Sequence, residues 1–194
     1  MEMARAPDPG AYRDLSENQQ HIINRWLVDL MVARAENRSG SEKVGLWCKG
    51  PTASGTTFAA SVAVLKAVNL AKRDLYGTVD WEYIAARDLE RLVRQSWSDP
   101  DRHPTDFDLF SEHSQVEAYV DWLFDCDLLW VDDLHVGVTD MSFFTRHLWP
   151  LMDRRVKRHK ATVVASSLEA RHLGQLTRAV QTWYHQLECD HATR

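Results

Sequence analysis

The sequence predicts a three-layer α/β domain with a mostly parallel sheet. After residue 40, short apolar runs alternate with segments of helical periodicity. A glycine-containing loop follows the first apolar run, and a later run ends in two acidic residues. Parallel strands need crossover helices, which cover both faces of the sheet. We therefore expect a leader and helix over residues 1–40 and the α/β domain over 41–194.

The first helix is predicted from a capping pattern. Ser16 and Gln19 have the spacing at which a serine oxygen and a glutamine satisfy the free N–H groups of a helix start. Apolar residues then follow at helical spacing, and the pattern ends at 37–40. We expect this helix to pack against the domain, and the alternative is a helix that docks on a partner.

The remaining elements follow from apolar runs and helical periodicity. Strands are expected at 44–48, 78–85, 128–131 and 162–165. Helices are expected at 57–72, 88–97, 116–123 and 143–152. Pro150 removes a backbone donor, so it should kink or restart the last of these helices.

Composition excludes some classes of protein. The net charge of −5 and the isoelectric point near 6.0 argue against a protein whose whole surface is basic and binds nucleic acid. Three cysteines, widely spaced and odd in number, predict free thiols in a reducing compartment. No apolar run approaches the roughly 18 residues of a membrane span. We expect a soluble, cytoplasmic protein with no membrane partner.

The loop between the first strand and the second helix has the spacing of a phosphate-binding loop. In the pattern G-x-x-x-x-G-K-S/T, Gly50 and Gly55 match the glycines and Thr57 matches the hydroxyl residue. Backbone N–H groups of such a loop, including that of Ser54, cradle phosphates. The position of the lysine holds Thr56 instead, so a positive charge at the phosphates is missing. The loop predicts ATP or ADP with Mg²⁺ as the ligand.

Two acids and two lysines extend this hypothesis. Asp132 and Asp133 follow an apolar strand, where a nucleotide site needs an acid beside the hydroxyl of Thr57 to hold Mg²⁺. Alternatively, the two acids only terminate the strand. Lys49 could replace the missing charge by folding back over the loop, or Lys43 could do so from the start of the strand. The alternative is that both lysines are solvated charges at the ends of the strand and do not contact the loop.

Four successive blocks resemble the DnaC/IstB family of AAA+ helicase loaders and transposition helper ATPases. They are residues 50–57, 81–89, the strand ending at 132–133, and 161–168, and the helix at 147–155 is also similar. The resemblance covers about residues 44–170 and implies a P-loop domain of AAA+ (RecA-like) type. It implies that Asp132 is the metal acid, that Asp133 positions water, and that Ser167 stands where the family has a sensor asparagine.

The departures from this family imply a degenerate member. Thr56 removes the lysine charge, and Ser167 has a shorter side chain than the sensor asparagine. Little chain follows Arg178, so we expect neither the arginine-finger helix nor a separate lid domain. An arginine finger alone contributes about 10³–10⁵ in rate. Hydrolysis is therefore expected to be reduced or absent.

The resemblance implies a helicase-loader-like accessory factor in DNA replication that binds a replicative helicase. The small size would suit a family member encoded by a phage or a mobile element. The alternatives are an active Mg²⁺-dependent ATPase and a scaffold-only regulator that binds no nucleotide. Homo-oligomerisation and binding of single-stranded DNA stay open.

A basic segment is the candidate for contact with single-stranded DNA. Such cations would bind phosphates with an affinity that falls steeply with salt. A solvated helix end, where cations complement the helix dipole, is the alternative. The segment comprises Arg154, Arg155, Lys157, Arg158 and Lys160.

Overall fold

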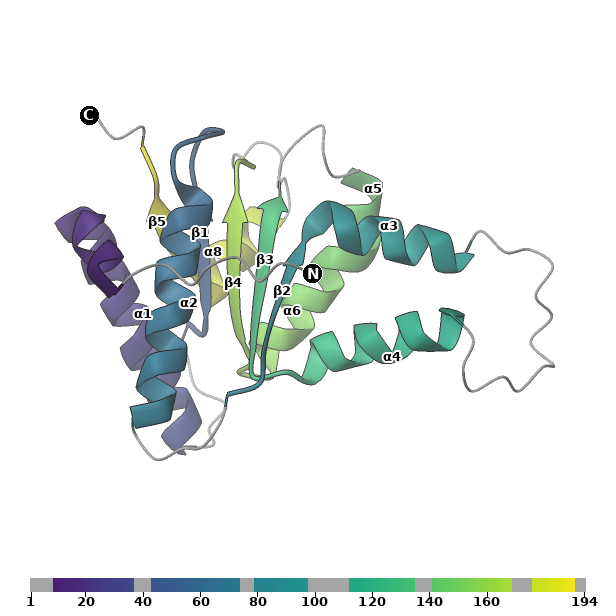
Figure 1. Ribbon diagram of the computed structural model, residues 1–194, viewed down its shortest axis with the longest axis horizontal. Coiled ribbons are helices and arrows are strands. Elements are labelled where there is room, and N and C mark those ends of the chain that lie inside the picture. Colours follow the sequence, from purple (N-terminus) through teal and green to yellow (C-terminus); the bar gives the residue numbers. More distant parts are fainter. Residues whose placement is uncertain are drawn as a thin grey trace.

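The protein has a five-stranded sheet in the order β2-β3-β4-β1-β5, in which every pairing is parallel. The computed structural model describes residues 9–36, 43–73, 79–97, 112–134, 141–168 and 176–190 (Figure 1). The predicted α/β class is confirmed. This strand order is typical of AAA+ P-loop domains, as the resemblance implied.

Four of the five strands were predicted from the sequence. β1 spans Gly45–Lys49, β2 Trp81–Ala85, β3 Leu128–Leu134, β4 Ala161–Ser166 and β5 Tyr184–Glu188. β5 lies at an edge of the sheet and pairs with β1. Only Tyr184 and Leu187 of this strand are buried, and the residues between and after them are half-exposed or exposed, so the segment lacks the continuous apolar run that marked the other strands. The prediction therefore missed it.

Helices cover both faces of the sheet (Figure 1). A short helix η1, Pro9–Asp14, precedes α1, Glu17–Glu36, and both α1 and α2, Thr56–Arg73, lie on one face. The other face carries α3, Ala86–Trp97, α4, Glu112–Asp125, α6, Trp149–Lys157, and α8, Leu176–Trp183. Alternation along β1 separates the two cores. Leu46 packs toward α2, whereas Trp47 packs toward the opposite layer.

The predicted capping box and the packing of α1 are both confirmed. The Gln19 N–H donates to Ser16 Oγ at 3.3 Å, and the Ser16 N–H donates to Gln19 Oε1 at 3.0 Å. The buried Trp26 donates from Nε1 to the carbonyl oxygen of Val44 at 3.0 Å. This bond joins α1 to the residue before β1. The predicted end of the helix at 37–40 lies outside the described residues.

Pro150 was predicted to kink or restart the helix that contains it, and a new helix does begin beside it. A short α5, Met141–Phe143, leads into a π-helical turn η2, Phe144–Leu148. α6 then begins at Trp149, with Pro150 in its first turn, where a missing N–H does no harm.

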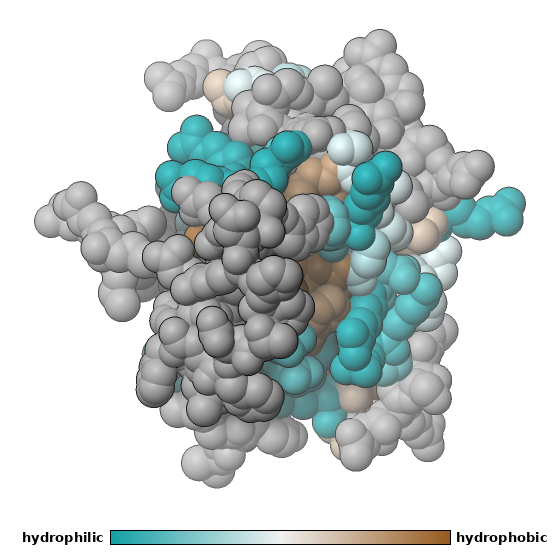
Figure 2. Space-filling model, turned by 90° about the vertical axis from the view of Figure 1, so that its right-hand side faces the viewer, coloured by the Kyte–Doolittle hydropathy of each residue, from teal (hydrophilic) through white to brown (hydrophobic). Residues whose placement is uncertain are grey.

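The side of the molecule that carries β2 has exposed aromatic residues. In Figure 2, hydrophobic residues are visible between hydrophilic ones on this side. Trp81 and Tyr83 of β2 are 43% and 39% exposed.

None of the described helices is long and apolar enough to cross a membrane. The three cysteines are free and buried, as predicted for free thiols.

Candidate nucleotide site

The glycine loop joins the carboxyl end of β1 to the amino end of α2. Gly55 has φ of 89°, which favours glycine, and Ala53 also has a positive φ of 65°. Gly50 is needed for a different reason. A Cβ there would collide with the carbonyl oxygen of Cys189 and with Ser54 Oγ. The end of β5 therefore lies directly against the loop, which only a glycine permits.

The loop directs a helix start toward the space where phosphates are expected. Thr56 is the first residue of α2, so the free N–H groups of that helix begin at the loop. Ser54 Oγ is buried and has no hydrogen-bond partner among the described residues. A buried hydroxyl without a partner is costly unless a ligand or water completes it. The loop thus offers donors suited to an anion, and none of them carries a charge.

The two neighbouring lysines are engaged elsewhere. Lys49 Nζ lies 2.9 Å from Glu188 Oε1 on the adjacent strand β5. Lys43 Nζ donates to the carbonyl oxygen of Gln181 at 2.6 Å. In this arrangement neither ammonium replaces the charge missing at Thr56.

Asp132 contacts the hydroxyl residue of the loop. Thr57 Oγ1 donates to Asp132 Oδ1 at 2.9 Å, which joins α2 to β3. Asp132 is only 4% exposed, and burial raises the pKa of its carboxyl despite the hydrogen bonds it accepts. A hydroxyl and a carboxylate are ligands that suit Mg²⁺, which completes its coordination with phosphate oxygens and water. The residues present therefore fit the predicted metal.

Asp133 sits in a β-bulge. The strand was predicted to end at residue 131, but β3 continues to Leu134 and includes both acids. The register with β4 shifts between Val131 and Leu134, and Asp133 has φ of 57°. The extra residue returns the buried Leu134 to the same core as Val131. Bulges of this kind occur next to active sites, where they re-aim a side chain.

Ser167 follows β4, the strand between β1 and β3. Its N–H donates to the carbonyl oxygen of Leu134 at 3.1 Å, and the Ser166 hydroxyl donates to the same oxygen at 2.7 Å. Ser167 is thus placed at the carboxyl edge of the sheet, between the strand that leads to the loop and the strand of the acids. That edge is where ligands bind in open α/β sheets.

The structure corrects one member of the basic segment. Arg155 was predicted as a DNA contact, but its side chain is fully buried. Its guanidinium donates to the carbonyl oxygens of Leu123 and Ala161 and to Thr162 Oγ1. Arg155 is buried because it lies on the side of α6 that faces the core, to which every third or fourth residue of the helix points. Arg155 cannot contact a nucleic acid.

The other members of the segment lie at the surface. Lys157 pairs with Asp153 at 2.6 Å, and Lys160 lies 3.6 Å from Asp127. Further exposed cations are Arg154, which lies over the ring of Phe124, and Arg158.

Two contacts of this site were not predicted. Glu188 belongs to the missed strand β5, and no motif marked it. Tyr83 lies on the predicted second strand, and burial together with the nearby Asp132 raises the pKa of its hydroxyl. No residue pattern indicates that proximity, because it depends on the pairing of β2 with β3.

No protein-family model matches the chain. No curated protein sequence matches it either. Solved structures match in fold at low identity. A replication initiator DnaA bound to AMPPCP and single-stranded DNA has a TM-score of 0.61 and 13% identity, covering 96% of this chain and 51% of that one. An AMPPCP-bound DnaA from Aquifex aeolicus has a TM-score of 0.58 and 13% identity, covering 94% and 50%.

A structure of DnaI matches along most of its length. Its TM-score is 0.56 at 15% identity, and the alignment covers 94% of each chain. In contrast, the chain spans about half the length of the two DnaA chains. These similarities show that the chain shares the α/β fold of DnaA and DnaI.

Proposed function

We propose that the chain is a helicase-loader-like accessory factor in DNA replication with a degenerate nucleotide site. The site would bind ATP or ADP with Mg²⁺ but would hydrolyse it poorly. The observation that carries this proposal is the bond between Thr57 and Asp132 at 2.9 Å beside a threonine in the lysine position. The pair proposed to hold the metal is hydrogen-bonded together, whereas the charge that should hold the phosphates is missing.

Each residue of the site would have a separate task. The loop N–H groups between Gly50 and Gly55, with the start of α2, would bind the phosphates. Thr57 and Asp132 would hold Mg²⁺, which neutralises charge on the phosphate oxygens when bound. Asp133 would orient water, and Ser167 would contact the terminal phosphate less well than an asparagine does.

The missing lysine sets the expected magnitude. A hydrogen bond to a charged group contributes about 1.5–3 kcal/mol. Because 1.4 kcal/mol corresponds to a factor of ten, the substitution at Thr56 lowers nucleotide affinity by roughly 10–150-fold. Binding in the micromolar range or weaker would follow for a site that otherwise resembles a working one.

The proposed partner is a replicative helicase. Support comes from the fold match to DnaI over 94% of both chains. For single-stranded DNA we propose contacts by the exposed Arg154 and Arg158, with weaker help from Lys157 and Lys160, which already pair with acids.

Titration with a fluorescent ATP analogue tests the site. The natural chain should bind weakly in Mg²⁺, Thr56→Lys should bind about 10–150-fold more tightly, and Asp132→Ala should lose the Mg²⁺-dependent part. Turnover by the natural chain that Asp132→Ala abolishes would instead support the ATPase alternative. Binding by neither the natural chain nor Thr56→Lys would leave only the scaffold alternative.

The partner is tested separately. Size-exclusion chromatography with light scattering should show a complex between this chain and the replicative helicase of its own organism. The assay also reports homo-oligomers of the chain alone. A chain that stays separate from the helicase, with and without Mg²⁺-ATP, would contradict the loader role without affecting the nucleotide site.

A further inference from the structure

β2 is an open edge of the sheet. The strand order places β2 and β5 at the two edges, and β2 pairs only with β3 among the described strands. The β5 edge is partly closed by α1. The side-chain amide of Gln19 donates to the carbonyl oxygen of Glu188 at 3.0 Å, and His185 Nε2 lies 2.8 Å from Asp29 Oδ2. The two edges therefore differ, because a helix contacts one and the outer backbone groups of the other face no described strand.

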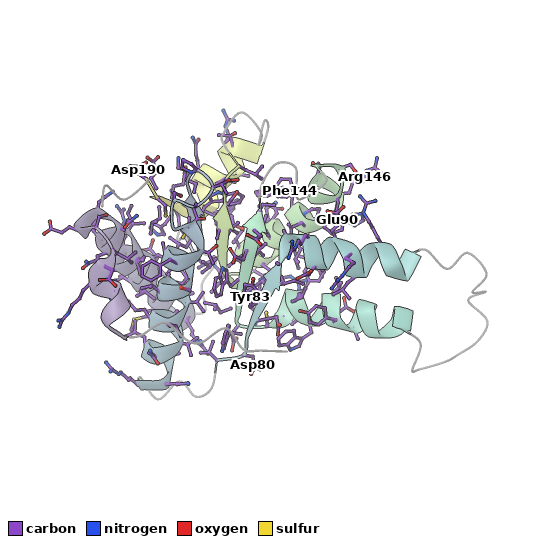
Figure 3. All side chains as sticks on the ribbon, turned by 45° about the horizontal axis from the view of Figure 1, so that its top comes forward. Asp80, Tyr83, Glu90, Phe144, Arg146 and Asp190 are labelled. Carbon is purple, nitrogen blue, oxygen red and sulfur yellow. The ribbon has the colours of Figure 1, made fainter. Side chains whose placement is uncertain are left out.

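Two exposed aromatic residues lie on one face of β2. Trp81 and Tyr83 are two positions apart, so their side chains point to the same side of the strand. Tyr83 stands opposite Trp130 of β3, and their rings meet edge to face with centroids 4.8 Å apart. Figure 3 labels Tyr83 on this strand. The neighbouring strand thus fixes one ring, while both rings stay exposed to solvent.

The opposite face of β2 carries an acid and a second pair of aromatic rings. Glu82 lies between Trp81 and Tyr83, so strand alternation turns it to this face. The Tyr119 hydroxyl of α4 donates to Glu82 Oε1 at 3.4 Å. Tyr119 in turn stacks on the exposed Trp122, with ring centroids 6.2 Å apart. Aromatic side chains therefore flank this edge on both faces of the sheet.

β2 lacks most of the features that protect an exposed edge from pairing. Natural proteins block such edges with proline, lysine or a bulge. β2 contains neither proline nor lysine, and its register with β3 runs from Trp81 to Ala85 without a shift. Its one charged residue, Glu82, is half-buried and hydrogen-bonded to Tyr119. A further strand can therefore add its backbone hydrogen bonds to β2.

The charge of this side of the sheet decides what kind of segment fits. Residues 79–86 and 126–134, which include β2 and β3, contain no basic residue and carry the acids Asp80, Glu82, Asp127, Asp132 and Asp133. Of these acids only Asp127 forms ion pairs with other described residues, which are Arg34 and Lys160. Such a surface repels the phosphates of a nucleic acid. A second copy of the chain would bring the acids of its own β2 beside these, which is also unfavourable.

We propose that β2 is the docking edge for an extended, basic segment of a protein partner, which adds to the sheet as a further strand. Backbone hydrogen bonds to β2 give the affinity, and alternate side chains give the specificity. On one face, arginine or lysine side chains lie over the rings of Trp81 and Tyr83. On the other face they pair with Glu82. Docking uses none of the loop residues 50–57, so it is tested without nucleotide.

Fluorescence anisotropy with a labelled peptide of about eight residues, in which arginine and valine alternate, tests this edge. The natural chain should bind it at low salt and should not bind the peptide in which glutamate replaces arginine. Methylation of the backbone nitrogens keeps the charge but removes the donors, so it should weaken binding at least about 10-fold. Equal binding of the methylated peptide would indicate adsorption by charge alone and overturn the proposal. So would failure to bind the arginine peptide, or tighter binding of labelled oligothymidylate that Trp81→Thr weakens.

Variants of the chain locate the peptide. Trp81→Thr keeps a strand-forming residue and should weaken binding by about 3–10-fold, and Glu82→Gln should weaken it by about 2–5-fold. The matched controls are Val28→Thr and Glu17→Gln, which change an exposed apolar residue and an exposed acid of α1, and both should leave the affinity unchanged. Equal affinities of all these chains would overturn the proposal. Melting temperatures show whether each variant is folded, and the methylated peptide tests the natural chain whatever they show.

Discussion

Replacement of Arg155 by alanine is expected to destabilise the fold by about 3–5 kcal/mol. The fully buried guanidinium donates to the carbonyl oxygens of Leu123 at 2.5 Å and Ala161 at 2.8 Å. Each buried carbonyl left without a partner costs about 1–3 kcal/mol. The space left by the side chain adds a cavity cost of at least about 1 kcal/mol. Relief of the buried charge offsets part of this sum.

Urea unfolding and calorimetry measure the effect. In a protein of this size, 1 kcal/mol shifts Tm by about 2–4 °C, so Arg155→Ala should melt about 6–20 °C lower. Arg154→Ala is the matched control. Arg154 is the preceding residue of α6 and lies over the ring of Phe124, 4.7 Å from its centroid. An exposed cation–π contact contributes about 0.5–1 kcal/mol, so this variant should lose less than about 4 °C.

The reasoning would be refuted if both variants lost the same small amount. Arg155 would then be exposed in solution, and its place among the candidate DNA contacts would be restored. A large loss for Arg155→Ala alone confirms that the basic segment is split by a core residue.

Two further predictions concern β5, the strand that the sequence did not reveal. Glu188→Gln should release Lys49 from its 2.9 Å ion pair and raise the affinity for an ATP analogue by about 2–10-fold, because a cation beside the loop becomes available. Stability should change by less than about 1 kcal/mol, and a second change, Lys49→Met, should cancel the gain in the same titration. His185 lies 2.8 Å from Asp29 of α1, and burial lowers the pKa of its imidazole below the ordinary 6.5. The unfolded chain therefore binds the proton more readily, so stability is complete above pH 6.5 and falls as the pH drops below it. Unfolding free energies from pH 5 to 8 should show a smaller decline for His185→Gln, and an equal decline would rule out His185 as its source.

The sequence by itself determined the order of the elements and the motif of the site. Apolar runs and helical periodicity are local properties of the chain, so they located four strands and the helices between them. The capping box at Ser16 depends on residues three apart and could be read directly. The spacing of Gly50 to Thr57 is equally local, since a loop needs its glycines at set positions. The lysine missing at position 56 was visible for the same reason.

Only the tertiary structure decided which side chains meet. The basic segment is uniform as a sequence, but α6 turns Arg155 into the core while Arg154 stays outside. Lys49 is paired because β5, formed from residues far along the chain, lies beside β1. Tyr83 lies on the same face of the sheet as Asp132 because β2 and β3 pair in one particular register. Such contacts depend on strand pairing and helix rotation, which local patterns constrain only in part.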